Sequence, residues 1–298
     1  MAAEAPITLR FTSPPSVACA YGKAVFMRRP VLVPAHQHVP HIEATLEQLV
    51  LTRARIDAFA RVAGSAPDHK CPLTLPHVAA MPLHLAILTS NAFPVRLLGL
   101  VHVENEIEQR RWLPADEPIA LRASLEGYED TPRGHEFSIE TEASIDGEVV
   151  WHAASRFLAR RPKRAGDGKP RSESAAAADP PAVTTTSWHC DADVGRRYGW
   201  ISGDINPIHL TDVSARLFGF DRAIAHGMWT LARIAHELGP EFPDGAVRVE
   251  TRFRAPIRLP AWVMLHHWRT GDRTEFRLRD GEGERMHVEG AFEPLQGA

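Results

Sequence analysis

The sequence is poor in the features that mark secreted and membrane-spanning proteins. Its three cysteines are odd in number and far apart, so neither a disulfide framework nor a Cys-x-x-Cys zinc site can be read from them. No apolar run approaches the roughly 20 residues of a membrane helix, and the N-terminus lacks the basic and apolar segments of a signal peptide. We therefore expect a cytoplasmic protein in a reducing environment, with no membrane segment.

The sequence also lacks a large excess of charge of either sign. Lys and Arg number 34 against 37 Asp and Glu, a net charge of -3, which provides no basic field for polyphosphate. The glycines form neither a GxGxxG pattern nor a P-loop. Nucleic acid is thus an unexpected partner, whereas 44% hydrophobic and 24% charged residues are typical of an ordered globular chain.

The chain divides into two halves. Its 298 residues are about twice the length of a typical domain. A stretch rich in Gly, Pro, Ser and Ala carries no periodic apolar face, which is typical of a linker. We predict an N-terminal unit over residues 1–163, a linker over 164–186 and a C-terminal unit over 187–298.

The two halves resemble each other at a constant offset of 146 residues. Val101-His102-Val103-Glu104, followed by Leu113-Pro114-Ala115, recurs as Val247-Arg248-Val249-Glu250, followed by Leu259-Pro260-Ala261. Because motif, spacing and order are all shared, we infer an internal duplication.

Each half has one apolar helix pattern followed by consecutive strand patterns. In the C-terminal half the helix covers Met228 to Leu238 and ends at Gly239, and alternating strands follow from Val247 onward. In the N-terminal half a helix near Leu83 to Leu88 precedes four strand patterns that begin near Leu98. This order predicts the α+β class, with an antiparallel sheet packed on a helix in each repeat.

The segment most informative about chemistry runs from Tyr198 to Leu210. Pro207 suits the first position of a helix and Asn206 its N-cap, and Leu210, Val213 and Leu217 continue at helical spacing until Gly219. We therefore expect one helix to start at Pro207.

This placement brings two proton acceptors together. Asp204 lies just before the cap and His209 in the first turn, so both can face one small volume. The positive end of the helix favours a carboxylate and disfavours a charged imidazole, and the pair is suited to activating water. The alternative is that Asp204 only helps to cap the helix and His209 is an ordinary surface residue.

Ser202-Gly203-Asp204-Ile205-Asn206-Pro207-Ile208-His209 resembles the signature of the MaoC-like acyl dehydratases, the (R)-specific enoyl-CoA hydratases. The downstream Ala225-His226-Gly227-Met228 resembles that family in register. The resemblance implies a double hot-dog, two repeats in which a sheet wraps a long central helix. It also implies a hydro-lyase of fatty acid metabolism that reversibly hydrates a trans-2-enoyl thioester.

The resemblance also assigns roles to individual residues. It makes Asp204 and His209 the acid/base pair and the Gly227 N–H the oxyanion donor. Asn206 supports this geometry, and Ser202 and Tyr198 support or pack against the reacting residues without contacting the substrate. It implies no metal and no redox cofactor. The expected partner is an acyl-CoA or acyl-carrier-protein thioester, and a homodimer of double hot-dogs is possible.

The N-terminal half departs from this pattern. Ser65 stands where Asp204 would be, Lys70 where His209 would be, and Met81 opposite Gly227. Asp68 and His69 are adjacent after a proline and lack the required spacing. We therefore expect one active site per chain.

Two other functions stay open. A hot-dog thioesterase would also bind acyl-CoA but would direct water at the carbonyl carbon, and a non-catalytic acyl-thioester-binding subunit would need no acid/base pair. The Asp204 to His209 motif argues against both. Acyl length, branching, carrier, physiological direction and oligomeric state cannot be read from the residues.

Overall fold

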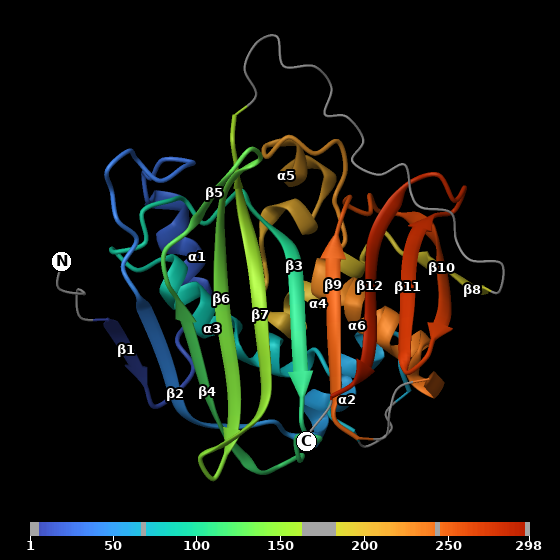
Figure 1. Ribbon diagram of the computed structural model, residues 1–298. Coiled ribbons are helices and arrows are strands. Elements are labelled where there is room, and N and C mark those ends of the chain that lie inside the picture. Colours follow the sequence, from blue (N-terminus) through green and yellow to red (C-terminus); the bar gives the residue numbers. More distant parts are fainter. Residues whose placement is uncertain (1–5, 67–69, 163–182, 242–244, 296–298) are drawn as a thin grey trace.

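The computed structural model describes residues 6–66, 70–162, 183–241 and 245–295. Two repeats share one continuous sheet, and the helices lie behind it (Figure 1). The N-terminal repeat contains β1 (Ile7–Phe11), α1 (Val17–Phe26), β2 (Ile42–Val50), α2 (Arg53–Val62), α3 (Leu75–Leu88), β3 (Leu100–Gln109), β4 (Pro118–Leu125), β5 (Glu129–Thr131), β6 (Gly134–Ile145) and β7 (Glu148–Arg160). The C-terminal repeat contains β8 (Thr184–Cys190), α4 (Val194–Ser202), η1 (Pro207–His209), α5 (Asp212–Arg216), α6 (Gly227–Glu237), η2 (Gly239–Glu241), β9 (Val247–Phe253), β10 (Ala261–Thr270), β11 (Arg273–Asp280) and β12 (Met286–Pro294).

The two repeats join along one pair of strands. The sheet order is β1-β2-β4-β6-β7-β3-β9-β12-β11-β10-β8, with β5 paired to β6. All pairs are antiparallel except β1 with β2. At the junction Asn105 of β3 lies opposite Thr251 of β9, and these two residues are 146 positions apart. Residues that are equivalent in the two repeats therefore face each other here, and the pseudo-two-fold axis passes between them.

Each repeat has a central helix against the inner face of the sheet. The α3 helix is buried on nearly every side and packs on β2, β4 and β6, as expected for a helix that is apolar all round. The α6 helix occupies the same place in the second repeat and begins at Gly227 with His226 as N-cap. The predicted α+β double hot-dog is confirmed.

Some element predictions were incomplete or wrong. The sequence patterns gave no indication of β1, α1 or β2. The helix expected to run on from Pro207 is instead a short 3-10 turn followed by a separate α5, because the Thr211 side chain caps the Ser214 N–H and restarts the helix. Val213 and Leu217 are exposed, and α6 has Leu238 rather than Gly239 as its C-cap.

The predicted domain boundary stays a prediction. Most of the 164–186 linker, residues 164–182, lies outside the described residues, and its last residues, from Thr184, already belong to β8. Cys19, Cys71 and Cys190 are all free thiols. Within the described ranges, no helix is both long and apolar enough to cross a bilayer.

Candidate active site

The segment between α4 and η1 is shaped by its backbone. Gly203 ends α4 with a φ of 77°, a left-handed conformation that glycine adopts without strain. The Asn206 side chain accepts the Ile208 N–H and so caps the turn that begins at Pro207. The predicted cap and the start of the turn are confirmed, and Asp204 lies on the extended chain before them.

Asp204 is held by hydrogen bonds from both repeats. The Tyr21 hydroxyl of α1 donates to Asp204 Oδ1 at 2.7 Å, and the Asn206 N–H donates to the same oxygen at 3.2 Å. The Asp204 N–H donates to Ser202 Oγ at 3.1 Å. The Asp204 side chain is 25% exposed, so its carboxylate is fixed but still reachable.

These contacts keep Asp204 ionised. Burial alone would raise its pKa, but nearby His226 and His209 and the bonds from Tyr21 and the Asn206 N–H together lower it. Burial and the Asp204 charge raise the pKa of Tyr21, so Tyr21 remains a donor. At neutral pH the site therefore contains a carboxylate and a neutral phenol.

His209 is buried, and one of its two ring nitrogens is hydrogen-bonded to the backbone. Its Nδ1 lies 2.7 Å from the Ile224 carbonyl oxygen, and since a carbonyl only accepts, Nδ1 carries the proton. Burial lowers the pKa of His209, partly opposed by Asp204. The ring is therefore neutral near pH 7, with Nε2 left as a proton acceptor.

His226 completes the cluster and was not assigned a role from the sequence. Its ring stacks on His209 with centroids 3.6 Å apart, and its Nε2 donates to the Asp204 carbonyl oxygen at 2.9 Å. Burial and His209 lower the pKa of His226 to about 3. A neutral His226 thus orients both the His209 ring and the Asp204 backbone.

Gly227 follows His226 directly and is the first residue of α6. The N–H groups of a helix's first turn have no acceptor within the helix, so they can donate to an oxygen outside it. A Cβ at Gly227 would lie 3.1 Å from the Phe253 ring, which leaves little room for a side chain.

The remaining predicted site residues lie beside this cluster. Ser202 holds the Asp204 backbone, as described above. The Tyr198 ring packs against His226 with centroids 4.8 Å apart, and its buried hydroxyl has no hydrogen-bond partner in the described part of the chain. Asp204, His209, Asn206, Ser202, Tyr198 and Gly227 are thus gathered in one place.

Tyr21 was missed because no local pattern points to it. It lies 183 residues from Asp204 in the sequence, on a helix that the apolar pattern did not predict. Gly195 was missed for a similar reason. A Cβ on Gly195 would lie 2.0 Å from the His209 carbonyl oxygen, so its lack of a side chain allows the His209 backbone to approach α4.

The N-terminal repeat has no equivalent oxyanion donor at Met81. The α3 helix begins six residues earlier than the offset predicts from α6, so Met81 lies in mid-helix. There its N–H belongs to the helical ladder. Lys70 lies over the Trp112 ring, 5.2 Å from its centroid, and Asp68 and His69 lie outside the described residues.

A metal fits this set of donors poorly. Asp204, His209 and His226 each offer a ligand atom within 4.8 Å of the others. However, the two imidazoles are stacked with an interplanar angle of 24°, so their in-plane lone pairs lie in two nearly parallel planes. They cannot both converge on one ion at the usual distance of about 2.0–2.1 Å.

A second histidine cluster lies on the N-terminal side. His77 and His84 of α3 are buried and His102 of β3 is partly buried, with ring centroids 5.0 Å apart for His77–His84 and 5.7 Å for His77–His102. Burial lowers the pKa of His77 to about 4 and that of His102 to about 3, so these rings are neutral. His102 also packs on Phe253, the ring that lies against Gly227.

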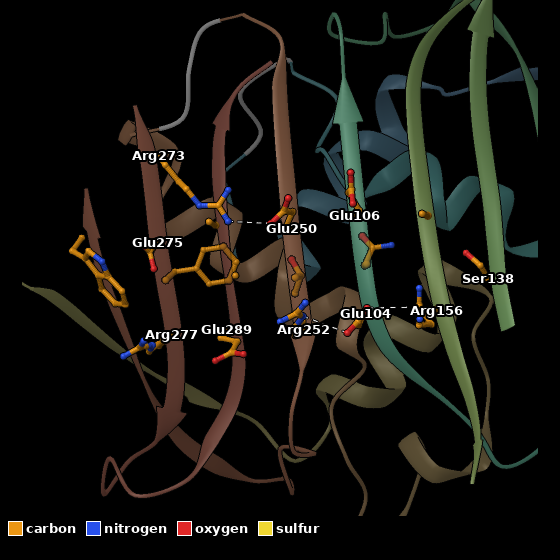
Figure 2. Close-up of a pocket in the computed structure, with 17 residues that line it drawn as sticks. Glu104, Glu106, Ser138, Arg156, Glu250, Arg252, Arg273, Glu275, Arg277 and Glu289 are labelled. Carbon is orange, nitrogen blue, oxygen red and sulfur yellow. Dashed lines mark hydrogen bonds and ion pairs between the residues drawn. The ribbon is translucent and has the colours of Figure 1, made fainter. Parts of the chain in front are cut away.

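A separate hollow of about 470 Å³ lies on the outer face of the sheet (Figure 2). Its charged groups pair with one another: Arg273 with Glu250, and both Arg252 and Arg156 with Glu104. Such partly exposed pairs are typical of a solvated sheet face. The Asp204 cluster therefore stays the candidate active site.

Comparisons with known proteins find relatives in both sequence and fold. The family model "MaoC like domain" matches residues 173–291. The 3-hydroxyacyl-thioester dehydratase X of Mycobacterium tuberculosis is 33% identical over 79% of this chain and 83% of its own length. The crystal structure of HtdX from the same species has a TM-score of 0.73 at 30% identity, covering 85% of this chain and 100% of that one. A MaoC-like dehydratase from Phytophthora capsici shares the fold, with a TM-score of 0.66 at 18% identity over 89% of this chain and 99% of that one.

Proposed function

This chain belongs to the MaoC-like dehydratase family, and from that premise we propose that Asp204 and His209 activate one water for addition to a trans-2-enoyl thioester. The reverse reaction dehydrates a 3-hydroxyacyl thioester. The observation that carries the proposal is the pair of acceptors, the Asp204 carboxylate and His209 Nε2, beside the first N–H groups of α6.

The proposed step moves one proton, in two transfers, and one pair of π electrons. Asp204 and His209 hold the water, whose oxygen bonds to carbon 3 of the acyl group while His209 Nε2 takes one of its protons. The π electrons shift toward the thioester oxygen, which accepts the Gly227 N–H as negative charge develops. Return of the proton to carbon 2 completes the addition of water, and we expect the (3R)-hydroxyacyl product.

The reaction as proposed needs no metal and no redox cofactor. All proton transfers use side chains of this chain, and no electron leaves the substrate. A chelator should accordingly leave turnover unchanged. Activity that a chelator abolishes and zinc restores would contradict this part of the proposal.

A thioesterase would use the same site for a different reaction, in which water attacks the carbonyl carbon and free CoA is released.

The experiment that separates the two is an absorbance assay for loss of the enoyl double bond across short, medium, long and branched CoA thioesters, with free CoA measured in the same samples. Loss of the double bond without release of CoA is the expected result. Release of CoA would support the thioesterase, and binding without either change would support a non-catalytic subunit.

One active site per chain is part of the proposal. Ser65→Ala should leave turnover intact, since the N-terminal repeat lacks the acid/base pair, whereas Asp204→Asn should abolish most of it.

A cytoplasmic location and a homodimer of the two-repeat chain also belong to the proposal. Sedimentation of the purified protein tests the homodimer.

A further inference from the structure

A groove of about 550 Å³ opens beside the catalytic segment. Its walls are Ala24, Val25, Met27, Arg28 and Arg29 at and just after the end of α1, Arg96 and Leu98 before β3, and Phe218 after α5. Tyr21, one helical turn before this wall, donates to Asp204, and α5 follows the turn that contains His209. The groove therefore lies between the two elements that border the site.

The groove is positively charged. Arg28, Arg29 and Arg96 line it, and no acidic residue does. Arg29 is fixed by hydrogen bonds to the Leu88 and Ser90 carbonyl oxygens. Arg28 and Arg96 are exposed, and no acidic side chain among the described residues pairs with either. Two free guanidinium groups are thus available to an acidic partner.

Exposed apolar side chains also lie on the segments that form the groove. Val25 (65% exposed) lines it and Phe26 (85%) follows in α1, while Val213 (72%) of α5 and Leu217 (80%) precede the wall residue Phe218. Isolated exposed hydrophobic residues are ordinary, but a cluster rimmed by unpaired charge marks an interaction surface. The free phosphates of CoA would explain the arginines but not this apolar rim.

We propose that the groove docks the acidic, amphipathic helical surface of an acyl carrier protein, which delivers its phosphopantetheine-linked acyl thioester to Asp204 and His209. The inference rests on the proposed function and deepens it by naming the carrier. A carrier protein supplies acidic side chains for Arg28 and Arg96 and apolar ones for Phe26 and Leu217. A second copy of this chain fits less well, because a two-fold contact would bring the same arginines of both copies together.

The test compares one acyl group on two carriers. Crotonyl-CoA and crotonyl thioester on a purified acidic acyl carrier protein are assayed with the wild type, with Arg28→Glu/Arg96→Glu and with Phe26→Ser. The matched control is Arg110→Glu/Arg111→Glu, two exposed arginines just beyond the opposite end of β3. We expect KM for the carrier-protein substrate to rise at least tenfold in both groove variants, with kcat unchanged and KM for crotonyl-CoA within about twofold. The control should match the wild type on both substrates.

Other outcomes overturn the inference. An equal rise in KM for both substrates would assign the arginines to a phosphate that the two substrates share. No change for either, or a wild type that hydrates only crotonyl-CoA, would remove the docking role while leaving the proposed function intact. A dimer that Phe26→Ser converts to a monomer in sedimentation would show that a second copy covers the face. Inactivity of the wild type on both thioesters would instead count against the proposed function itself.

Discussion

Asp204 and His209 differ in how their protonation states are set. Asp204 is kept charged by the hydrogen bonds from Tyr21 and the Asn206 N–H, whereas His209 is kept neutral by burial, with a carbonyl that fixes its tautomer. Both groups are therefore acceptors at the same pH, which is what holding one water requires. These protonation states are what the acid/base role requires. The alternative left open by the sequence, in which Asp204 only helps to cap the helix, does not require them.

The pair should behave as one unit in mutagenesis. Asp204→Asn or His209→Gln should lower kcat by roughly 10²–10⁴, the usual range for a positioned proton-transfer group. The double variant should be much less impaired than the product of the two single effects. If Asp204 only capped the helix, the variants would lose about 1 kcal/mol of stability and keep near-normal turnover. Thermal stability measured on the same variants therefore separates a catalytic role from a capping role.

Tyr21 is a positioning residue whose effect passes through Asp204. Tyr21→Phe removes a hydrogen bond that lowers the Asp204 pKa, so the acid limb of the kcat/KM profile should move to higher pH. The loss of kcat at the optimum should be smaller than in the acid/base variants. Tyr198→Phe is the control, because the Tyr198 hydroxyl has no partner in the described ranges, and it should keep the limb in place. An unshifted limb in Tyr21→Phe would rule out the positioning role.

At the scale of elements, the sequence predicted those parts that repeat or alternate locally. The strands β9 to β12 and the helix α6 were predicted from their periodicity. The 146-residue offset relates Asn105 to Thr251, which lie opposite each other where β3 pairs with β9. The cap at Asn206 was read from the proline after it. What could not be read were contacts between distant elements, such as α1 with Asp204 or His226 with His209, since no local spacing encodes them.

The contact between α4 and η1 is one such distant effect and can be tested. Gly195→Ala places a Cβ 2.0 Å from the His209 carbonyl oxygen, so one of the two backbones must move. Overpacking of this kind costs about 1–3 kcal/mol of stability. The folded enzyme should also lose at least about tenfold in kcat, because catalysis is sensitive to shifts of about 1 Å.

Gly22→Ala is the matched control for this substitution. Gly22 also lies within a helix, α1, but nothing lies within 4 Å of the Cβ it would gain. Unfolding and kcat should be measured on both variants, and Gly22→Ala should be about 0.5–1 kcal/mol more stable than the wild type with unchanged kcat. A Gly195→Ala protein with wild-type kcat would show that this approach does not position His209.

At the scale of the whole molecule, the interior contains an unusual number of neutral histidines. His77, His84, His209 and His226 are buried and His102 is partly buried, and burial lowers the pKa of each. They lie along the boundary between the repeats, where the N-terminal cluster touches Phe253 and the catalytic cluster joins η1 to α6. The stability of both repeats therefore depends on histidines that stay neutral in the folded protein.

This burial predicts a steep loss of stability in mild acid. A histidine whose folded pKa lies below its unfolded value of about 6.5 stabilises the fold above that pH, and the stabilisation is lost as the pH falls toward the folded pKa, because only the unfolded chain takes up the proton. Each of the five should cost about 1.4 kcal/mol per pH unit below about 6, against a total stability of about 5–15 kcal/mol. Urea unfolding at pH 7.5, 6.5, 5.5 and 5.0 should therefore show a fall of about 2 kcal/mol between the two higher values and a much steeper fall below pH 6.5. His84→Gln should reduce the slope by about one proton. Equal stability at pH 7.5 and 5.0 would mean that the buried histidines are protonated in the folded protein.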